Sequence, residues 1–245
     1  MSPSEKIKFI SNWIKLYVDQ MPISAQSLVI GISGGIDSSV SSTLSAMTGI
    51  KTIVLTMPIR QKDNQHDLSL KHQDWLIKNF QNVEAHTINL DKLFESFSST
   101  LKKFNNEHGY ENSRARLRMT TLYQVAAANK GIVVGTGNKV EDFGVGFYTK
   151  YGDGGVDISP IADCNKTEVW ELGKELGILK EIIDAPPTDG LWDDGRTDEG
   201  QLGFKYEDLE DAMKNPNSPH RQEYEKIRKQ NLHKMEPIPV CKIPS

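Results

Sequence analysis

Cysteine and long apolar runs are both scarce in this sequence. The two cysteines, Cys164 and Cys241, form no C-x-x-C pair, so neither a zinc site nor a disulfide framework is indicated. Such cysteine usage is typical of a protein from a reducing cytoplasm. No apolar run approaches the roughly 20 residues that span a membrane, and the first residues lack the apolar core of a signal peptide. We therefore expect a cytoplasmic chain with no membrane partner.

Basic character is also lacking. The formal net charge is -4, and Lys and Arg form no long run. Since binding of nucleic acid usually needs a basic face, we expect no nucleic acid partner. What is present is a chain of 245 residues with 37% hydrophobic content, which is enough for one sizeable core. We assign residues 1–245 to a single domain.

Apolar runs alternate with helical patterns along the chain. Strands are expected at residues 27–32, 50–57, 83–90, 132–135 and 156–158. Helices are expected from residue 3 onward and at 38–46, 66–80, 93–104, 113–129, 165–176, 206–213 and 220–232. The polar segments 60–68 and 185–203 are expected to be loops. This alternation predicts an α/β fold, a doubly wound, Rossmann-like five-stranded parallel sheet with helices on both faces.

The stretch 27–40 combines a buried strand, a glycine turn and the start of a helix. The paired glycines Gly34 and Gly35 let a ligand approach the main chain, and the helix start is a natural phosphate seat. Neither G-x-x-x-x-G-K-[ST] nor G-x-G-x-x-G is present, which excludes two common phosphate motifs. Asp37 beside the expected phosphate either indicates bound magnesium or only stabilises the helix start by roughly 0.3–1 kcal/mol. Local sequence leaves both interpretations open.

Two further segments have compositions that suit a binding site. Residues 135–141, G-T-G-N-K-V-E, follow the fourth expected strand. In an open α/β sheet this position makes them a candidate second wall of a nucleotide site. Residues 147–155, F-Y-T-K-Y-G-D-G-G, mix Lys150 and Asp153 with glycines, and Asp157 follows shortly after. This mixture favours a binding role over an ordinary turn.

The loop Ser33-Gly34-Gly35-Ile36-Asp37-Ser38 resembles the S-G-G-x-D-S pyrophosphate loop of the ATP pyrophosphatases, which adenylate a substrate and release pyrophosphate. Within that superfamily, segments 135–141 and 147–155 look like those of the NAD synthetases. The same resemblance holds, in the right order over nearly the whole chain, at 115–119, 165–167, 187–188, 198–199, 202–203 and 233–234. The stretch F-x-T-K-Y-G-D-G-G is highly specific to that family.

This resemblance implies a ligase that adenylates the nicotinate carboxylate of deamido-NAD with ATP and magnesium, after which ammonia attacks to give NAD and AMP. It implies ATP contacts for Gly31, Ile32, Ser33, Gly34, Gly35, Ile36, Asp37, Ser38, Thr136, Lys166 and Thr188. Deamido-NAD contacts are implied for Arg116, Lys150, Asp157, His233 and Lys234. Magnesium contacts are implied for Asp37 and Glu141, and catalytic roles for Lys166 and Asp153, the latter in ammonia capture.

The sequence departs from the family pattern at a few positions. Ile36 stands where several members carry a polar residue. The segment 137–139 stands where others have an acid and a histidine, so the adenosine contacts of those side chains are not transferred. Only Arg116 matches on the helix at 113–129, and Arg114 and Arg118 are expected in surface or interface ion pairs. Since the family forms homodimers with the dinucleotide near the interface, we expect a homodimer built partly on this helix.

Alternatives to this assignment stay open. Another ATP pyrophosphatase, GMP-synthetase-like or tRNA-thiolating, would share the loop, although thiolating enzymes normally need reactive cysteines and a basic surface. A non-enzymatic adenine-nucleotide sensor would share the core, but it would not need Asp37, Glu141 and Lys166 to converge. We expect free ammonia as nitrogen donor, unless a separate amidase subunit supplies it. We expect no amidase segment on either side of the matched region, and neither cysteine has a recognisable base and orienting acid.

Overall fold

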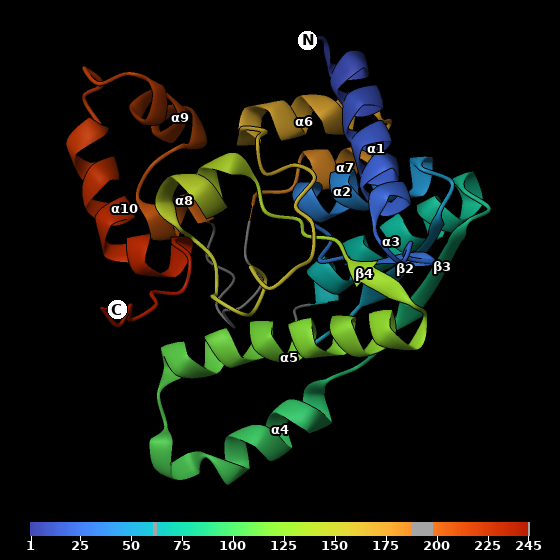
Figure 1. Cartoon of the computed structure of the whole chain (residues 1–245), viewed down its shortest axis with the longest axis horizontal. Helices are drawn as coiled ribbons and strands as arrows, with labels where there is room; N and C mark the ends of the chain where they lie inside the picture. The colour runs from blue at the N-terminus through green and yellow to red at the C-terminus, as the bar shows by residue number, and fades with distance from the viewer. Residues whose placement is uncertain (61–62, 188–197, 245) are drawn as a thin grey trace.

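Four parallel strands form the centre of the computed structural model, which describes residues 1–60, 63–187 and 198–244. The strands are β1 (Ser27–Gly31), β2 (Lys51–Thr56), β3 (Val83–Thr87) and β4 (Gly131–Val133). They lie in the order β3-β2-β1-β4, and every neighbouring pair is parallel (Figure 1). The prediction of a parallel α/β sheet is confirmed.

The number of strands was predicted wrongly. Residues 156–158, expected as a fifth strand, contribute one isolated parallel bridge, between Ile158 and Val134. The backbone N–H of Val133 donates instead to Oδ2 of Asp157 at 2.7 Å, so a side chain occupies a donor that a neighbouring strand would use. Pro160, two residues after Ile158, has no N–H group that could continue a strand ladder. The described sheet therefore has four strands and not five.

Helices cover both faces of the sheet (Figure 1). One face packs against α1 (Pro3–Gln20), α2 (Ile36–Met47), α3 (Asp63–Asn79), α6 (Lys166–Glu175) and α7 (Lys180–Ile183). The other face packs against α4 (Asp91–Thr100) and α5 (Glu107–Ala128), with the short η1 (Lys102–Phe104) between them. Successive strand residues point to opposite faces, so Leu28 and Ile30 join the first core and Val29 joins the second. This double covering explains why β1 and most of β2 are buried, whereas the edge strand β3 carries exposed polar residues.

The C-terminal helices form a third cluster beside the sheet. They are α8 (Asp198–Leu202), α9 (Tyr206–Lys214) and α10 (Arg221–Met235), and α9 and α10 pack on the short π-helix η2 (Lys139–Val145). The expected helices at 206–213 and 220–232 are confirmed. The segment 60–68 is not wholly a loop, because α3 begins at Asp63. Within 185–203, α8 replaces the end of the expected loop.

The strand order fixes where a ligand can bind. The chain builds β1, β2 and β3 in one direction and then places β4 on the other side of β1. Loops that leave the carboxyl ends of β1 and β4 therefore diverge, and the crevice between them is the usual ligand site of such sheets. The loop that follows β1 carries Ser33 to Ser38, and the loop that follows β4 carries Thr136 and Glu141.

Among the helices in the described part of the chain, none has the length and apolar character needed to span a membrane.

Candidate active site

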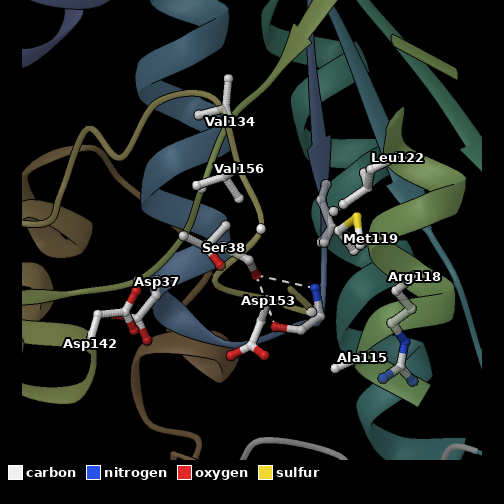
Figure 2. A pocket seen from close by; sticks show the side chains of 18 of the residues that line it. Asp37, Ser38, Ala115, Arg118, Met119, Leu122, Val134, Asp142, Asp153 and Val156 are labelled. Atoms are coloured by element: carbon white, nitrogen blue, oxygen red, sulfur yellow. Dashed lines mark hydrogen bonds between the residues drawn. The ribbon is translucent and has the colours of Figure 1, made fainter. Parts of the chain in front are cut away.

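The loop after β1 is closed by its own side chains. Gly34 has a φ of 88°, a conformation that favours glycine. Ser38 Oγ lies 3.0 Å from Ser33 Oγ and accepts from the Ser33 backbone N–H at 3.2 Å (Figure 2). Helix α2 begins directly behind, at Ile36, whose side chain is buried in the core. The loop thus presents main-chain donors at a helix N-terminus, the geometry that binds phosphate.

Three predicted residues from three separate segments converge behind this loop. Lys166 Nζ lies 2.5 Å from Oδ2 of Asp37 and 2.9 Å from Oε1 of Glu141. Lys166 is the first residue of α6, Asp37 lies in the first turn of α2, and Glu141 lies in η2. The lysine side chain is 2% exposed, whereas the two carboxylates keep 18% and 15%. The ammonium therefore lies beneath the two carboxylates, and the carboxylates reach the open side.

The charges of this cluster stabilise one another. Burial alone would lower the pKa of Lys166, but Asp37 and Glu141 outweigh it and raise that pKa above its ordinary value. Burial would raise the pKa of Glu141, yet the ammonium and two hydrogen bonds hold it below its usual value. Burial does raise the pKa of Asp37, against the opposing charge of Lys166. Lys166 is thus a charged, buried counter-ion shared by two acids.

Two residues that the sequence interpretation missed hold the carboxylates in place. The amide of Asn138 donates to Oδ1 of Asp37 at 3.1 Å, and its oxygen accepts from the N–H groups of Val140 and Glu141. The hydroxyl of Tyr206, at the start of α9, donates to Oε1 of Glu141 at 2.5 Å. Its ring also lies under the Lys166 ammonium, at 4.9 Å. Asn138 could have been found as a helix N-cap after a strand, but nothing local marks Tyr206.

A cavity of about 230 Å³ opens above these groups. Figure 2 shows Asp37 and Asp142 on one wall and Ala115, Arg118 and Met119 of α5 on the other. Of the predicted site residues, the structure brings the following to its lining: Gly31, Ile32, Ser33, Asp37, Ser38, Thr136, Glu141 and Asp153. The cavity thus joins the β1 loop, the β4 loop and the F-Y-T-K-Y-G-D-G-G segment, as expected from their positions.

Asp142 is a further acid in this cavity that the sequence interpretation did not select. A Cβ atom on Gly137 would lie 1.9 Å from Oδ2 of Asp142, so the carboxylate fills the space that a side chain at 137 would need. Burial raises the pKa of Asp142 well above its ordinary value, and the charges of Asp153, Glu141 and Asp37 add to this. No local sequence pattern distinguishes Asp142 from other acids. Its place in the cavity follows from the fold of η2, which directs its side chain inward.

The F-Y-T-K-Y-G-D-G-G segment is fitted closely onto α5. A Cβ on Gly152 would lie 2.8 Å from the Cβ of Ala115, so only glycine allows this approach. Oδ1 of Asp153 accepts from the backbone N–H of Thr149 at 2.9 Å, which aims the carboxylate from within its own turn. Arg116 donates through Nε and Nη2 to the carbonyl of Lys150 at 3.3 Å. The predicted residues Arg116 and Lys150 therefore lie side by side next to the lining residues Ala115 and Gly152, and neither lines the cavity itself.

The remaining predicted contacts lie away from the cavity lining. Asp157 accepts from the Tyr123 hydroxyl at 3.0 Å and from the Val133 N–H, so both of its oxygens bond within the protein. Lys234 donates to the carbonyl of Tyr148 at 2.7 Å, and the Tyr148 hydroxyl donates back to the carbonyl of Lys234. His233 is exposed in the last turn of α10. Thr188 lies outside the described residues.

The expectation of surface or interface ion pairs for the other two arginines of α5 holds in part, because Arg114 does form an ion pair, although a buried one. Arg114 is buried, pairs with Glu111 and lies 5.0 Å over the ring of Phe94. Arg118 donates to the carbonyl of Met57 at 3.0 Å and lines the cavity. Sequence spacing places residues on a face of a helix, but it does not show which face meets the sheet and which meets α4. Arg118 is therefore a candidate ligand contact, and Arg114 belongs to a buried ion pair against the Phe94 ring.

Neither cysteine lines the cavity. Cys164 is buried, and burial raises the pKa of its thiol to about 11. It packs in the core between α1 and α6, as expected for a small packing residue. Cys241 is exposed in the C-terminal segment.

Taken together, a parallel sheet, a glycine loop at its switch point and a cluster of carboxylates and lysine define an α/β enzyme that acts on a nucleotide polyphosphate. The model of the family described as NAD synthase matches residues 6–243. The chain belongs to this family and is therefore a ligase of NAD biosynthesis.

Individual relatives agree with the family match. An NH(3)-dependent NAD(+) synthetase from Carboxydothermus hydrogenoformans is 37% identical over 212 residues, which cover 84% of this chain and 83% of that one. One from Alkaliphilus metalliredigens is 33% identical over 98% of this chain and 99% of its own. Among solved structures, an NMN synthetase from Francisella tularensis has a TM-score of 0.91 and 32% identity, covering 99% of this chain and all of that one.

Proposed function

We propose that the chain, as one domain over residues 1–245, converts deamido-NAD to NAD with ATP and free ammonia. In this reaction the nicotinate carboxylate attacks the α-phosphorus of ATP, and pyrophosphate leaves. Ammonia then attacks the acyl adenylate, loses a proton, and displaces AMP. The observation that carries the proposal is the convergence of Asp37, Glu141 and Lys166 behind the loop 33–38. A passive nucleotide sensor would not require this buried cluster.

The ATP side of the site is assigned to the two strand-end loops. Residues 31–38 are assigned to the phosphates, with the main-chain N–H groups at the start of α2 as donors, and Thr136 contacts the nucleotide from the second wall. We assign Thr188 to the same substrate by resemblance alone. Because such a reaction develops charge on the transferred phosphoryl group, fixed donors and cations suffice and no protein nucleophile is needed. The inert thiol of Cys164 accords with this.

Magnesium fits the donors at Asp37 and Glu141. The described part of the chain holds no cluster of three or more His, Cys, Asp or Glu side chains arranged for a metal. Magnesium, however, is commonly bound by one or two carboxylates together with substrate phosphates. The two partly exposed carboxylates supply such a pair of oxygens beside the phosphate loop. When bound, the ion would neutralise charge on the phosphates.

The acyl side is assigned to the segment on α5. Asp153 lies in the cavity and is held by the Thr149 N–H, so we assign it to ammonia capture. Arg116 and Lys150, with Asp157, His233 and Lys234, are assigned to deamido-NAD. Arg116 is exposed, although it donates to the Lys150 carbonyl. Asp157 and Lys234 are already hydrogen-bonded within the chain, and direct contact would require them to exchange partners.

A second candidate substrate is nicotinate mononucleotide. The solved NMN synthetase matches this chain over its full length at a TM-score of 0.91, and its name states a mononucleotide product. The mononucleotide shares the nicotinate, ribose and phosphate of deamido-NAD, so the same adenylation site would serve both. The relatives named for NAD favour the dinucleotide. Only the contacts to the extra AMP half can separate the two substrates.

The test is amidation of both substrates by the purified chain with ATP, magnesium and ammonium. We expect kcat/KM for deamido-NAD to exceed that for nicotinate mononucleotide. The reverse order would assign the chain to mononucleotide amidation, and no turnover of either would remove both candidates. A parallel assay with ammonia-free glutamine tests the nitrogen donor, and we expect no product there. Relatives named as ammonia-dependent, matched over most of their own length, support that expectation.

Assembly and location complete the proposal. We infer a homodimer whose contacts include α5, because Arg116 is exposed on that helix beside Lys150 and could reach a dinucleotide shared with a second copy. A chain that is a monomer by light scattering at micromolar concentration and is also fully active would contradict this homodimer.

The proposed cytoplasmic location rests on two free thiols, which suit a reducing compartment.

A further inference from the structure

The Lys166 ammonium occupies a position that matters for any metal at the neighbouring acids. Its nitrogen is hydrogen-bonded both to Oδ2 of Asp37 and to Oε1 of Glu141. A magnesium ion bound through these same oxygens would need to approach each to roughly 2.1 Å. An ammonium already within hydrogen-bond distance of both oxygens stands against that approach by its size and by its like charge.

Charge counting leads to the same result. Asp37 and Glu141 bring two negative charges, and Lys166 neutralises one of them. A divalent ion added to these three side chains would leave them with one excess positive charge, which is unfavourable in a poorly solvated site. The triphosphate of ATP supplies the missing negative charge. It also offers Lys166 a new partner, because lysine binds phosphate readily as a point charge.

The surroundings of Lys166 favour its present place when nucleotide is absent. The Tyr206 ring lies beneath the ammonium, and the Tyr206 hydroxyl fixes Oε1 of Glu141. Asn138 fixes the other oxygen of Asp37. Both carboxylates are thus oriented toward the lysine by neutral donors. Asp142 and Asp153 also line the cavity, so experiments on Lys166 must leave both unchanged.

We propose that Lys166 keeps free divalent metal off the Asp37–Glu141 pair, so that metal binds there only together with a polyphosphate. Lys166 then has two positions: with the two acids in the nucleotide-free protein, and at the phosphates when ATP brings its metal. The proposal rests on the proposed function only in taking ATP as the nucleotide. It does not depend on which acyl substrate is amidated.

The test measures binding of Mn²⁺, a paramagnetic probe for the magnesium site, by electron paramagnetic resonance without nucleotide. We expect the wild-type chain to show no binding at this site, and Lys166→Gln to bind one ion at least about tenfold more tightly. That gain should disappear in Lys166→Gln/Asp37→Asn. Lys71→Met, which removes an exposed lysine paired with Glu181, should behave as wild type. Addition of α,β-methylene ATP should restore Mn²⁺ binding to the wild type.

Two results would overturn the proposal. One is wild-type binding of free Mn²⁺ that is lost in Asp37→Asn, and the other is a folded Lys166→Gln that gains no binding. Because Lys166→Gln leaves two buried acids without their cation, its folding is checked by circular dichroism, with Lys166→Met as a second variant. If neither folds, the wild-type measurements decide alone. Mn²⁺ that binds only with the nucleotide analogue supports the proposal, and equal binding without it contradicts it. None of these measurements requires amidation activity.

Discussion

Lys166 and Asp37 are 129 positions apart in the sequence, yet their charged groups lie 2.5 Å apart. The contact joins the first turn of α6 to the first turn of α2, and Glu141 of η2 completes it. Each of the three segments thus contributes one charge to a single buried cluster. Loss of any one charge therefore affects the site as a whole.

The first prediction concerns the two acids. We expect Asp37→Asn and Glu141→Gln each to lower kcat/KM by at least about 100-fold, because the reacting phosphates lose a preorganised charge and a metal ligand. Each variant should stay folded, since Lys166 keeps its other carboxylate. Pyrophosphate release measures the activity and circular dichroism the fold. Asp163→Asn, an exposed acid that pairs with Lys139, is the control and should keep activity. Full activity in Asp37→Asn would contradict the assignment.

The second prediction concerns Tyr206. Tyr206→Phe removes the hydroxyl that bonds Glu141 but keeps the ring beneath Lys166. We expect activity to fall about 10- to 100-fold, the usual cost of losing a group that orients a metal ligand. The matched control is Tyr224→Phe, a buried tyrosine of the same helical cluster. If both variants have equal activity, the Tyr206 hydroxyl does not position Glu141.

Most of the fold could be predicted from sequence because its signals are local. Strand runs and the glycine turn were marked by short patterns, and four of five strands and the doubly wound type are confirmed. The segment 156–158 failed because its apolar run resembles a strand, while the Asp157 side chain takes the hydrogen bond that would extend the sheet. Whether a side chain or a neighbouring strand accepts from the Val133 N–H depends on tertiary contacts, so the local composition does not predict it.

The site follows the same division. Asp37 and Glu141 follow strands that meet at one sheet edge, so their meeting could be foreseen. Tyr206 lies 65 positions from Glu141, and only the packing of α9 on η2 brings it there. The burial of Arg114 and the place of Arg118 in the cavity lining were missed because helical spacing does not reveal what each face of α5 meets. Long-range packing is thus the part that sequence reasoning missed.

A third prediction uses the close fit of Gly137 and Asp142. In Gly137→Ala the new Cβ would lie 1.9 Å from Oδ2 of Asp142, so the carboxylate must move. We expect the free energy of unfolding to fall by about 1–3 kcal/mol, as for overpacking elsewhere. In Gly137→Ala/Asp142→Ala the loss should be smaller than the sum of the single losses. Urea unfolding measures all three variants, and strictly additive losses would contradict the contact.

A fourth prediction concerns pH. His72 is fully buried, with Nε2 3.0 Å from Ser42 Oγ, and burial lowers its pKa to about 4. In the unfolded chain the pKa is about 6.5, so falling pH protonates the unfolded state first. The stability that neutral His72 gives the folded state is therefore present above pH 6.5. As pH falls toward 4 this stability is lost, and the free energy of unfolding decreases by roughly 3 kcal/mol. Urea unfolding between pH 7 and 4 should show this extra loss in the wild type but not in His72→Gln. Parallel pH curves would contradict it.

The central claim is that this chain adenylates deamido-NAD and then transfers the acyl group to ammonia. The most direct measurement is the product balance of the purified chain with ATP, magnesium, ammonium and deamido-NAD, followed by chromatography. The account predicts NAD, AMP and pyrophosphate in equal amounts, with no pyrophosphate release when deamido-NAD is left out. Formation of ADP and phosphate, or pyrophosphate release that does not depend on the acyl substrate, would contradict it.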